Sequence, residues 1–517
     1  MATGNEKLAN SLSVLEALQK AGKHVVRSSD LSRTHLTRLK EGGYLKEVIK
    51  GWFLPSRPEL GAKGSSAAWF IGMREFIAGY CNERFGDNWH LAPDQSLMLR
   101  TGERSLPKQI QIWAPAANNQ PVPLPHGCSM FLYRPPRLYE AQPIADASGM
   151  RLITVPAGLV AVGPAFFTQQ PLAARIALNS VADVSELLRP LLDGSHSQIA
   201  GRLAGAMRAV HRAAEADEIL ETMRAAGHTV VETQPFDAPQ NELPGGRTQS
   251  PYVQRLRLMW AEMREVVVEV FPRPGPVPTD VQATLADVSE RYVADAYHSL
   301  SIEGYRVTPE LIEKVRNGNW DPDGADAATR DALAAKGYYE AHTKVKDFIG
   351  RTVREHPSEW PLRDALTSWY RELFGPSVAA GILKASDLAG WRAKAVFLRG
   401  AMHVPLSPEA VLDTMPVFFE LLAKEPDAGV RAVLGHFFFV YIHPYMDGNG
   451  RLGRFIMNSM LVPAGYVWTI VPMPRRDDYM AALEQASTYR NIRPLAEFIG
   501  GLVIEQTAAP LPPPGSR

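Results

Sequence analysis

The chain has only two cysteines, Cys81 and Cys128, among its 517 residues. Two cysteines exclude a framework of several disulfides and a zinc site with four cysteine ligands, and they favour a reducing compartment. The sequence also lacks net charge, because Lys+Arg and Asp+Glu both number 55. The overall charge therefore gives no sign of a polyanionic partner, although a local basic patch remains compatible with it.

Long apolar runs and internal repeats are missing as well. The most apolar stretches, such as GLVAVGPAFF, are too short to cross a bilayer, and the N-terminus has no signal-peptide pattern. These absences predict a cytoplasmic protein without a membrane partner. At about 100–200 residues per domain, the length predicts two to four domains.

Proline- and glycine-rich stretches indicate where those domains meet. LPGGRTQSP (Leu243–Pro251) has the composition of a linker, and FPRPGPVPTD (Phe271–Asp280) separates two helical stretches. We predict a multidomain chain with an N-terminal winged helix-turn-helix, a mixed α/β middle region, a helical third region and a disordered tail. The predicted ranges are 1–58, 59–244, 247–506 and 507–517, in that order.

The first region has the order helix, helix, helix and hairpin that is typical of a winged helix-turn-helix. The candidate recognition helix carries basic and hydroxyl residues on the side away from its leucines, and such a helix could enter a DNA major groove. These residues are Arg33, Thr34, Thr37 and Arg38. The alternative is a small helical domain with a solvated basic face, or one that binds a protein.

The stretch SDLSRTHLTRLKEGGYLKEVIKGWFLP resembles the N-terminal domain of AbiEi-type antitoxins, which are winged-helix regulators. A weaker similarity continues through WHLAPDQSLMLRTGERSLPKQIQIW and ARIALNSVADVSELLRPLL. In the middle region we expect strands near KQIQIWAP, SMFLYRP and RLITVPA and no chemistry. His90, Asp94 and His126 are interpreted as structural residues.

The stretch YIHPYMDGNGRLGRFIMN places a histidine, an acid, a glycine-rich turn and two arginines between apolar segments. Gly448 and Gly450 permit backbone angles that let neighbouring amides form an anion-binding nest. The following helix adds unpaired N–H groups and the positive end of its dipole. Arg451 and Arg454 lie in its first turns, where two cations make sense if an anion binds between them.

The remaining two polar residues complete a set for nucleotidyl or phosphoryl transfer. Asp447 beside a phosphate nest indicates a hard cation shared with the phosphates, most simply Mg²⁺. His443 can act as a base near neutral pH. The alternatives are a structural corner with a buried histidine, or a zinc site formed by His436, His443 and Asp447. The zinc site is disfavoured because it lacks a histidine pair at i, i+4.

HPYMDGNGRLGR closely resembles the signature of the Fic family, with Tyr445 where the family usually has Phe. The resemblance implies an all-helical core and transfer of AMP from ATP to a hydroxyl of a target protein, with the chain itself as one candidate target. It further implies the following roles: His443 as the base, Asp447 as the Mg²⁺ ligand, Gly448, Asn449 and Gly450 as phosphate ligands, Arg451 as support for the triphosphate, and Arg454 as the γ-phosphate contact. Doc-type kinases alter the second glycine of this turn, and the intact Gly450 favours AMP transfer over phosphorylation.

The motif SLSIEG resembles the Fic inhibitory motif and precedes the signature by about 150 residues. We expect a helix that ends near Gly304, with an inhibitory segment at about 280–304. The resemblance implies that Glu303, with Ser299 on the same face, pairs with Arg454 and fills the γ-phosphate space. ATP would then bind with its α-phosphate misaligned.

The segment Gly390–Pro408 has the pattern of a β-hairpin, and the resemblance implies a flap that positions the target.

Three functions stay open at this point. The first is a self-inhibited adenylyltransferase with an N-terminal module that binds DNA or a partner. The second is a regulator or antitoxin-like protein with a nucleotide-sensing core. The third is an enzyme that removes AMP, with Glu303 orienting a water.

Overall fold

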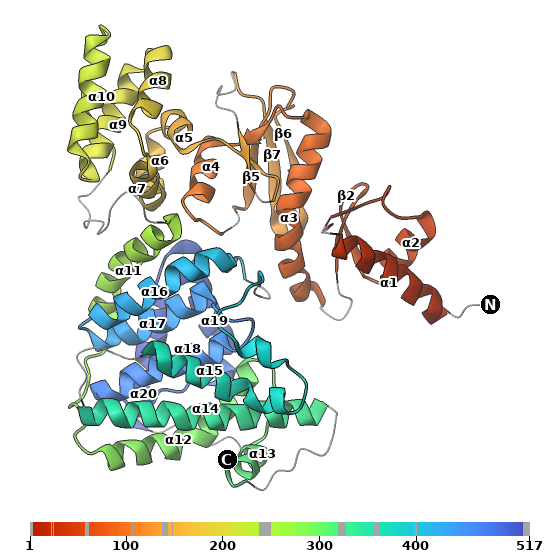
Figure 1. Cartoon of the computed structure of the whole chain (residues 1–517), viewed down its shortest axis with the longest axis vertical. Coiled ribbons are helices and arrows are strands. Elements are labelled where there is room, and N and C mark those ends of the chain that lie inside the picture. Colours follow the sequence, from red (N-terminus) through yellow and green to blue (C-terminus); the bar gives the residue numbers. More distant parts are fainter. Residues whose placement is uncertain are drawn as a thin grey trace. The chain divides into compact units, whose positions relative to one another are not determined.

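The computed structural model describes residues 4–21, 23, 25–56, 61–105, 107–136, 143–146, 148–236, 250–318, 327–355, 362–396, 398 and 401–509. The chain forms two compact units (Figure 1). Unit 1 comprises Met1–Arg255 with Phe397–Val404, and unit 2 comprises Leu256–Val396 with Pro405–Arg517. The predicted boundaries near residues 58 and 244–247 lie outside the described residues.

Unit 1 begins with a small sheet and two helices. The elements are α1 (Gly4–Lys20), β1 (Val26–Arg27), α2 (Arg33–Glu41), β2 (Leu45–Ile49) and β3 (Trp52–Pro55). The antiparallel strands lie in the order β1-β3-β2. Leu15, Leu39 and Phe53 lie in the core between helices and sheet. Gly51 turns the chain between β2 and β3 with a φ of 84°, which favours glycine.

The three-helix order predicted for this region is wrong for its described part, which holds two helices. Between β1 and α2 the chain forms a turn. The carboxylate of Asp30 accepts hydrogen bonds from the Arg27 N–H and the Lys23 ammonium, and the Asp30 N–H donates to the Arg27 carbonyl. Such local side-chain bonds compete with helix formation. The winged helix-turn-helix is therefore not confirmed.

The middle of unit 1 is a four-stranded sheet with the order β4-β5-β7-β6. Its elements are β4 (His90–Leu91), β5 (Gln109–Trp113), β6 (Gln120–Pro123) and β7 (Ser129–Tyr133), with β5 and β7 parallel. Helix α3 (Gly61–Phe85) lies beside this sheet, and α4 (Pro93–Arg100) follows β4 (Figure 1). The predicted strands are confirmed at β5, β7 and the short β9 (Arg151–Leu152), which pairs with β8 (Ile144–Ala145).

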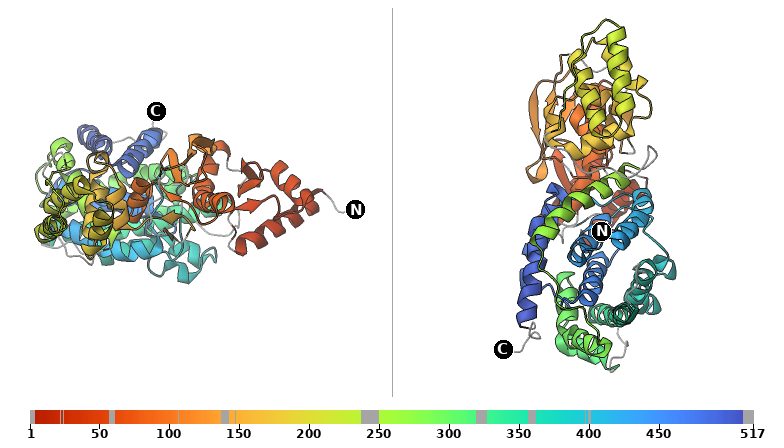
Figure 2. Two further views of the ribbon diagram at one scale, coloured as in Figure 1. Left: turned by 90° about the horizontal axis from the view of Figure 1, so that it is seen from above. Right: turned by 90° about the vertical axis from the view of Figure 1, so that its left-hand side faces the viewer.

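A helical group completes unit 1, beside the orange sheet in Figure 2. It consists of α5 (Val155–Ala161), α6 (Ala165–Gln169), α7 (Pro171–Ser180), α8 (Ser185–Asp193), α9 (Ser197–Ala209) and α10 (Ala213–Ala225). The chain after α10 runs along α9, where a Cβ on Gly201 or Gly205 would collide with its carbonyl groups. The Thr233 N–H donates to the Gly201 carbonyl at 3.1 Å. Glycine on α9 therefore permits a close backbone contact.

The regular elements in the described residues of unit 2 are all helices. It contains α11 (Pro251–Val270, shared with unit 1), α12 (Val281–Ile302), α13 (Pro309–Arg316), α14 (Ala327–Glu355), α15 (Leu362–Ala379), α16 (Pro408–Lys424), α17 (Ala428–Ile442), α18 (Asn449–Leu461), α19 (Arg476–Tyr489) and α20 (Arg493–Ala508). Helices α17 and α18 form the centre, and α14, α15, α16, α19 and α20 pack on one or both of them. The all-α core predicted from the sequence is confirmed.

The ends of α12, α13 and α20 test the predicted boundaries of unit 2. Gly304 follows α12 with a φ of 90°, where the sequence predicted the helix to end. Thr308 caps α13 by accepting the Leu311 N–H. Helix α20 extends to Ala508, two residues beyond the expected end, and 510–517 lie outside the described residues. None of the described helices has the length and apolar character that crossing a membrane requires.

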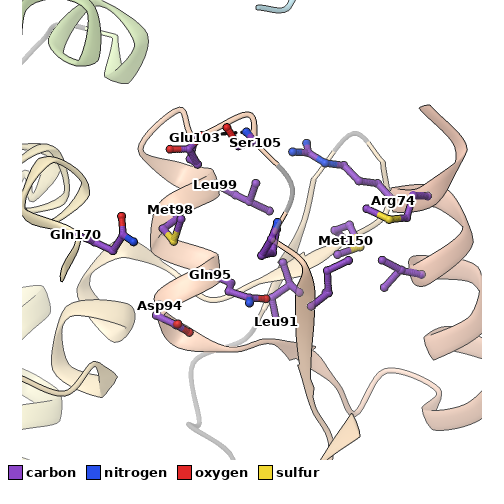
Figure 3. A pocket seen from close by; sticks show the side chains of 14 residues that line it. Arg74, Leu91, Asp94, Gln95, Met98, Leu99, Glu103, Ser105, Met150 and Gln170 are labelled. Carbon is purple, nitrogen blue, oxygen red and sulfur yellow. Dashed lines mark hydrogen bonds between the residues drawn. The ribbon is translucent and has the colours of Figure 1, made fainter. Parts of the chain in front are cut away.

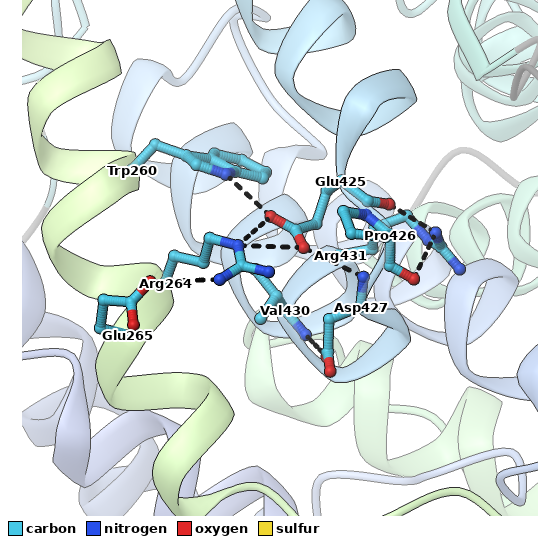
Figure 4. Close-up of polar contacts among 8 residues, drawn as sticks. All are labelled: Trp260, Arg264, Glu265, Glu425, Pro426, Asp427, Val430 and Arg431. Atoms are coloured by element: carbon cyan, nitrogen blue, oxygen red, sulfur yellow. Dashed lines mark hydrogen bonds and ion pairs between the residues drawn. The ribbon is translucent and has the colours of Figure 1, made fainter. Parts of the chain in front are cut away.

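A buried carboxylate fixes the start of α17. Glu425 accepts hydrogen bonds from Arg264 Nε at 3.0 Å, from the Trp260 indole at 3.4 Å and from the Asp427 N–H at 3.0 Å (Figure 4). Its backbone carbonyl accepts from Arg431 Nη1 at 2.6 Å. Asp427 then caps α17 by accepting the Val430 N–H. This network ties α11 to the helix whose other end carries the histidine of the predicted site.

Candidate active site

His443 ends α17 in a left-handed conformation, with a φ of 56°. Positive φ is uncommon outside glycine and is often found at functional sites. Arg392 stabilises this backbone from a distant part of the chain. Its Nε donates to the His443 carbonyl at 2.7 Å, and its N–H donates to the Pro444 carbonyl at 2.9 Å.

The imidazole of His443 is half-buried and held in one orientation. Its Nδ1 lies 3.3 Å from the Val440 carbonyl oxygen, which can only accept a hydrogen bond. The ring proton therefore belongs on Nδ1, and Nε2 keeps its lone pair. Burial lowers the pKa of His443 to about 4, so the ring is neutral at pH 7. These properties are those of a general base.

The turn after His443 is braced by the Asn449 side chain. Its Oδ1 accepts the Tyr445 N–H at 3.0 Å, and its Nδ2 donates to the Tyr445 carbonyl at 2.9 Å. The Tyr445 ring stacks on Tyr370 with centroids 3.7 Å apart. The side chain of Asn449 is thus used within the protein. Only its backbone N–H remains for the phosphate role predicted from the sequence.

Gly448 allows the chain to enter α18. It has a φ of 80°, and a Cβ there would lie 2.8 Å from the ring of Phe374. Its N–H donates to Asp447 Oδ1 at 2.6 Å. The first N–H groups of α18 follow, at residues 449–451, and have no partner within the helix. These N–H groups lie where the sequence predicted a helix N-terminus able to bind an anion.

Arg451 places a buried positive charge beneath this turn. Its side chain is 1% exposed, and its guanidinium lies 5.1 Å from the centroids of both Tyr305 and Phe374. Nη2 is 3.4 Å from Asp447 Oδ1, and Nε has no hydrogen-bond partner among the described residues. The aromatic rings and Asp447 therefore fix a cation at the N-terminus of a helix, where the dipole disfavours it.

Arg454 contacts Ser299 and Glu303 in the segment for which the sequence predicted an inhibitory role. Its Nε donates to Ser299 Oγ at 2.7 Å, and its Nη2 donates to Glu303 Oε1 at 2.7 Å. The Arg454 side chain is 3% exposed, whereas that of Glu303 is 27% exposed. A Cβ added to Gly450 would collide with the same carboxylate oxygen. Glu303 thus lies directly against the first turn of α18.

One guanidinium nitrogen of Arg454 is not used in the contacts with Ser299 and Glu303. Its Nη1 is buried without a hydrogen-bond partner in the described part of the chain, and it lies 3.4 Å from the position of a Cβ on Gly450. A buried N–H without a partner is costly and calls for an explanation. An anion bound at the start of α18 would satisfy it.

Further polar groups near Arg454 were not foreseen from the sequence. Tyr338 donates to Asp295 Oδ2 at 2.6 Å, and burial raises the pKa of Asp295 to about 6. Asp295 lies one helical turn before Ser299, so helical spacing could have identified it. Arg392 could not have been identified in this way, because nothing in the sequence links it to His443.

Asp447 is the residue available for a hard cation. Its side chain is 62% exposed beside the N-terminus of α18. Mg²⁺ commonly binds through one or two carboxylates together with substrate phosphates, so one exposed carboxylate at a phosphate site fits it. No group of three or more His, Cys, Asp or Glu among the described residues could hold a metal. His436 is instead hydrogen-bonded to Tyr479 at 2.7 Å, and the zinc alternative is not supported.

The β-hairpin expected at Gly390–Pro408 is not confirmed, because the described residues of this segment contain no strand. Part of it, at 397 and 399–400, lies outside the described residues. In the described part of the segment, Arg392 explains why no strand pair forms. Its guanidinium donates to the carbonyls of Lys394, Leu406 and His443, so these groups are bound by a side chain instead of by a neighbouring strand.

Residues 362–461 match the Fic/DOC family. This range runs from α15 to α18 and contains His443 to Arg454, while Ser299 and Glu303 precede it. Among curated proteins, the chain is 29% identical over 248 residues to "Protein adenylyltransferase Fic" of Nematostella vectensis, covering 46% of this chain and 53% of that protein. A protein of the same name from Drosophila mojavensis is 29% identical over 218 residues, covering 41% and 39%. The chain thus spans about half or less of these relatives.

A solved structure of Fic-1 from C. elegans also matches. It is 18% identical and covers 65% of this chain and 96% of that chain, with a TM-score of 0.37. A score this low supports no statement about the fold.

Proposed function

We propose that unit 2, which carries the Fic/DOC match, is a protein adenylyltransferase that moves AMP from ATP to a hydroxyl side chain of a target protein. The observation that carries the proposal is the arrangement at the start of α18. A neutral histidine, a helix N-terminus and two buried arginines converge there, and one buried N–H of Arg454 lacks a partner. The names of the relatives support the same reaction.

In this proposal His443 activates the target. Its Nε2 takes the proton of the hydroxyl while the hydroxyl oxygen attacks the α-phosphorus of ATP. The bond between the α-phosphorus and the oxygen that bridges to the β-phosphate breaks, and pyrophosphate leaves. The backbone N–H groups of 449–451 and the guanidinium of Arg451 stabilise the charge of the phosphates.

Asp447 would hold Mg²⁺ together with the phosphates of ATP. The cation would neutralise the charge that builds up on the leaving pyrophosphate. The ion pair between Asp447 and Arg451 keeps this carboxylate beside the phosphate turn. Asp447→Ala is therefore expected to cut activity steeply and to weaken its dependence on Mg²⁺.

Glu303 restrains the reaction in this proposal. Its carboxylate binds Arg454 Nη2 at 2.7 Å and lies against Gly450, where the γ-phosphate would otherwise bind. ATP could bind only with its phosphates displaced, so the α-phosphorus would not be in line with the target hydroxyl. A misplacement of about 1 Å can cost about 10²-fold in rate.

The test is incorporation of label from α-³²P-ATP with Mg²⁺ into the purified chain and into lysate proteins. We expect weak labelling by the wild type and strong labelling by Glu303→Gly. The matched control is Glu290→Gln, an exposed carboxylate on the same helix, which should behave like the wild type. Glu303→Gly without increased labelling would contradict the restraint, and no labelling by any variant would contradict AMP transfer. Loss of AMP from a pre-labelled protein in the presence of the wild type, but not Glu303→Gly, would favour AMP removal instead.

DNA binding by residues 1–58 is a second candidate function. Arg33, Thr34 and Thr37 are exposed on α2, and Arg38 is half-buried. This face could contact phosphates even though the described residues of this region lack the third helix of the predicted motif. We expect the full chain to bind duplex DNA with an affinity that falls with salt, and Arg33→Ala with Arg38→Ala to lower the salt dependence. Unchanged binding by the double variant would favour a protein partner.

A further inference from the structure

Unit 1 contains a cavity of about 240 Å³ between α3, α4 and β5 (Figure 3). Its wall is largely apolar and includes Met73, Ile77, Leu91, Leu99 and Ile110. A cavity of about 150 Å³ lined by such side chains can hold benzene. This cavity therefore has room for a ligand with an apolar body somewhat larger than one aromatic ring.

Arg74 and Ser105 bring hydrogen-bond donors to the wall of this cavity. Arg74 extends from α3 into it, towards Ser105 in the view of Figure 3. The hydroxyl of Ser105 is buried and makes no hydrogen bond within the described residues, and neither does Nε of the neighbouring Arg104. No ion pair of Arg74 is found among the described residues. Buried donors of this kind are costly unless a ligand satisfies them.

Two acidic residues, Glu103 and Asp94, line the cavity. Glu103 forms an ion pair with Arg255 and also accepts the N–H groups of Arg104 and Ser105, so its charge is already balanced. Asp94 lies in the first turn of α4, on the far side of the cavity from Arg74 in Figure 3. Outside this lining, the Asp146 carboxylate also acts on Arg74, and its Oδ1 accepts hydrogen bonds from the Ser148 hydroxyl and the Met150 N–H. A ligand carboxylate therefore competes with Asp146 for Arg74 but breaks no ion pair found among the described residues.

Two amide side chains, Gln95 and Gln170, also line the cavity. The side chain of Gln95 donates to the Gln109 carbonyl at 2.9 Å and accepts the Gln111 N–H at 2.9 Å, which fastens α4 to β5. Gln95 is thus unavailable to a ligand. The buried Ser105 hydroxyl lacks a hydrogen-bond partner among the described residues, Gln170 lies on the far side of the cavity from Arg74 in Figure 3, and most of the remaining wall is apolar.

We propose that this cavity binds a small amphipathic carboxylate, with the carboxylate on Arg74 and the Ser105 hydroxyl and the apolar body between α3, α4 and β5. A carboxylate matches the planar donor pair of a guanidinium and accepts a further hydrogen bond from a hydroxyl. The apolar wall contributes affinity and the donors select the charge. This proposal concerns unit 1 alone and does not depend on AMP transfer by unit 2.

The experiment is calorimetric titration of the full chain with octanoate, octan-1-ol and octylamine, which share one apolar body and differ in charge. We expect octanoate to bind with a stoichiometry near one and about tenfold or more tighter than octan-1-ol. Arg74→Met should remove that advantage and leave the affinity for octan-1-ol within about twofold. Arg84→Met, which changes an exposed arginine of the same helix, should leave all affinities unchanged.

A second variant tests the position of the ligand independently of its charge. Met98→Trp places a larger side chain in the wall and should weaken both octanoate and octan-1-ol. Equal octanoate affinity in the wild type and Arg74→Met would overturn the proposal. So would tighter binding of octylamine, no binding of octanoate at millimolar concentration, or binding that Met98→Trp does not change.

Discussion

Each unit of this protein holds an arginine in its interior, and the two arginines are treated differently. In unit 2, Arg454 is bound by Ser299 and Glu303, which lie about 150 residues earlier in the chain. In unit 1, Arg74 extends into a mostly apolar cavity and has no ion-pair partner among the described residues. The first cation is largely satisfied by its own chain, and the second is not.

This difference between the two arginines predicts how each site would respond to an anion. An anion that reaches Arg454 has to displace a carboxylate, so occupancy of that site depends on where Glu303 lies. An anion that reaches Arg74 breaks no ion pair found among the described residues, and it shares this cation with the nearby Asp146 carboxylate. We therefore expect the site in unit 2 to be regulated and the cavity in unit 1 to bind its ligand directly.

The largest expected effect concerns the chemistry that only unit 2 should perform. In the Glu303→Gly background, His443→Ala should lower AMP transfer by about 10²-fold to 10⁴-fold, because the target hydroxyl loses its base. ATP binding should persist, since the imidazole acts on the hydroxyl and not on the triphosphate. Labelling with α-³²P-ATP and equilibrium ATP binding check both parts. Undiminished labelling would remove His443 from the mechanism.

Replacing Arg454 or Arg74 should affect the free energy of unfolding differently. Arg454→Met should lower the free energy of unfolding of unit 2 by about 3 kcal/mol, because it leaves Glu303 and Ser299 without their partner. The value is at the lower end for buried pairs because Glu303 is 27% exposed. Arg74→Met should leave the stability of unit 1 unchanged or raise it by up to about 1 kcal/mol, since no ion pair is broken. Urea unfolding followed by tryptophan fluorescence measures both stability changes. Equal losses in the two variants would contradict the difference between the two arginines.

Acid should destabilise unit 2 through its buried histidines. Burial lowers the pKa of both His342 and His436 to about 3, against about 6.5 in the unfolded chain. Between these values the unfolded state binds more protons, so stability falls as the pH is lowered from 6.5. At pH 5 each of these two histidines should lower the free energy of unfolding by about 2 kcal/mol. Asp295, with its pKa raised to about 6, acts in the opposite direction.

Urea unfolding at pH 7 and pH 5 checks this dependence. His342→Phe is the informative variant, because the ring packs among the aromatic side chains of Tyr292, Phe455 and Trp468. It should reduce the loss between the two pH values by about 2 kcal/mol. An unchanged loss in this variant would contradict the assignment to His342.

The smallest expected effect is on ATP affinity. Glu303→Gly frees Arg454 and the space beside Gly450, so Mg²⁺-ATP should bind about tenfold tighter than to the wild type. Calorimetric titration measures the difference, and Glu290→Gln is again the control. Wild-type affinity in Glu303→Gly would mean that the carboxylate does not compete with the γ-phosphate.

Much of the helical part of the fold could be predicted from local signals. Asp280, Thr308 and Asp427 each cap a helix, and Gly304 and Gly448 adopt the positive φ that glycine favours. The N-terminal region was less predictable. Asp30 closes a turn there with Arg27 and Lys23, and the sequence alone does not show whether an Asp near a helix start caps the helix or closes a turn.

The sequence by itself determined the candidate site of unit 2, because His443 to Arg454 are contiguous and local geometry places them at one helix N-terminus. Even the contact between Glu303 and Arg454 could be predicted, since both belong to recognisable motifs. Only the tertiary structure decided that Arg392 holds His443, that Tyr305 and Phe374 enclose Arg451, and that a cavity surrounds Arg74. These features join residues far apart in the chain through close packing, and packing depends on the shapes of many side chains at once, which no local pattern records.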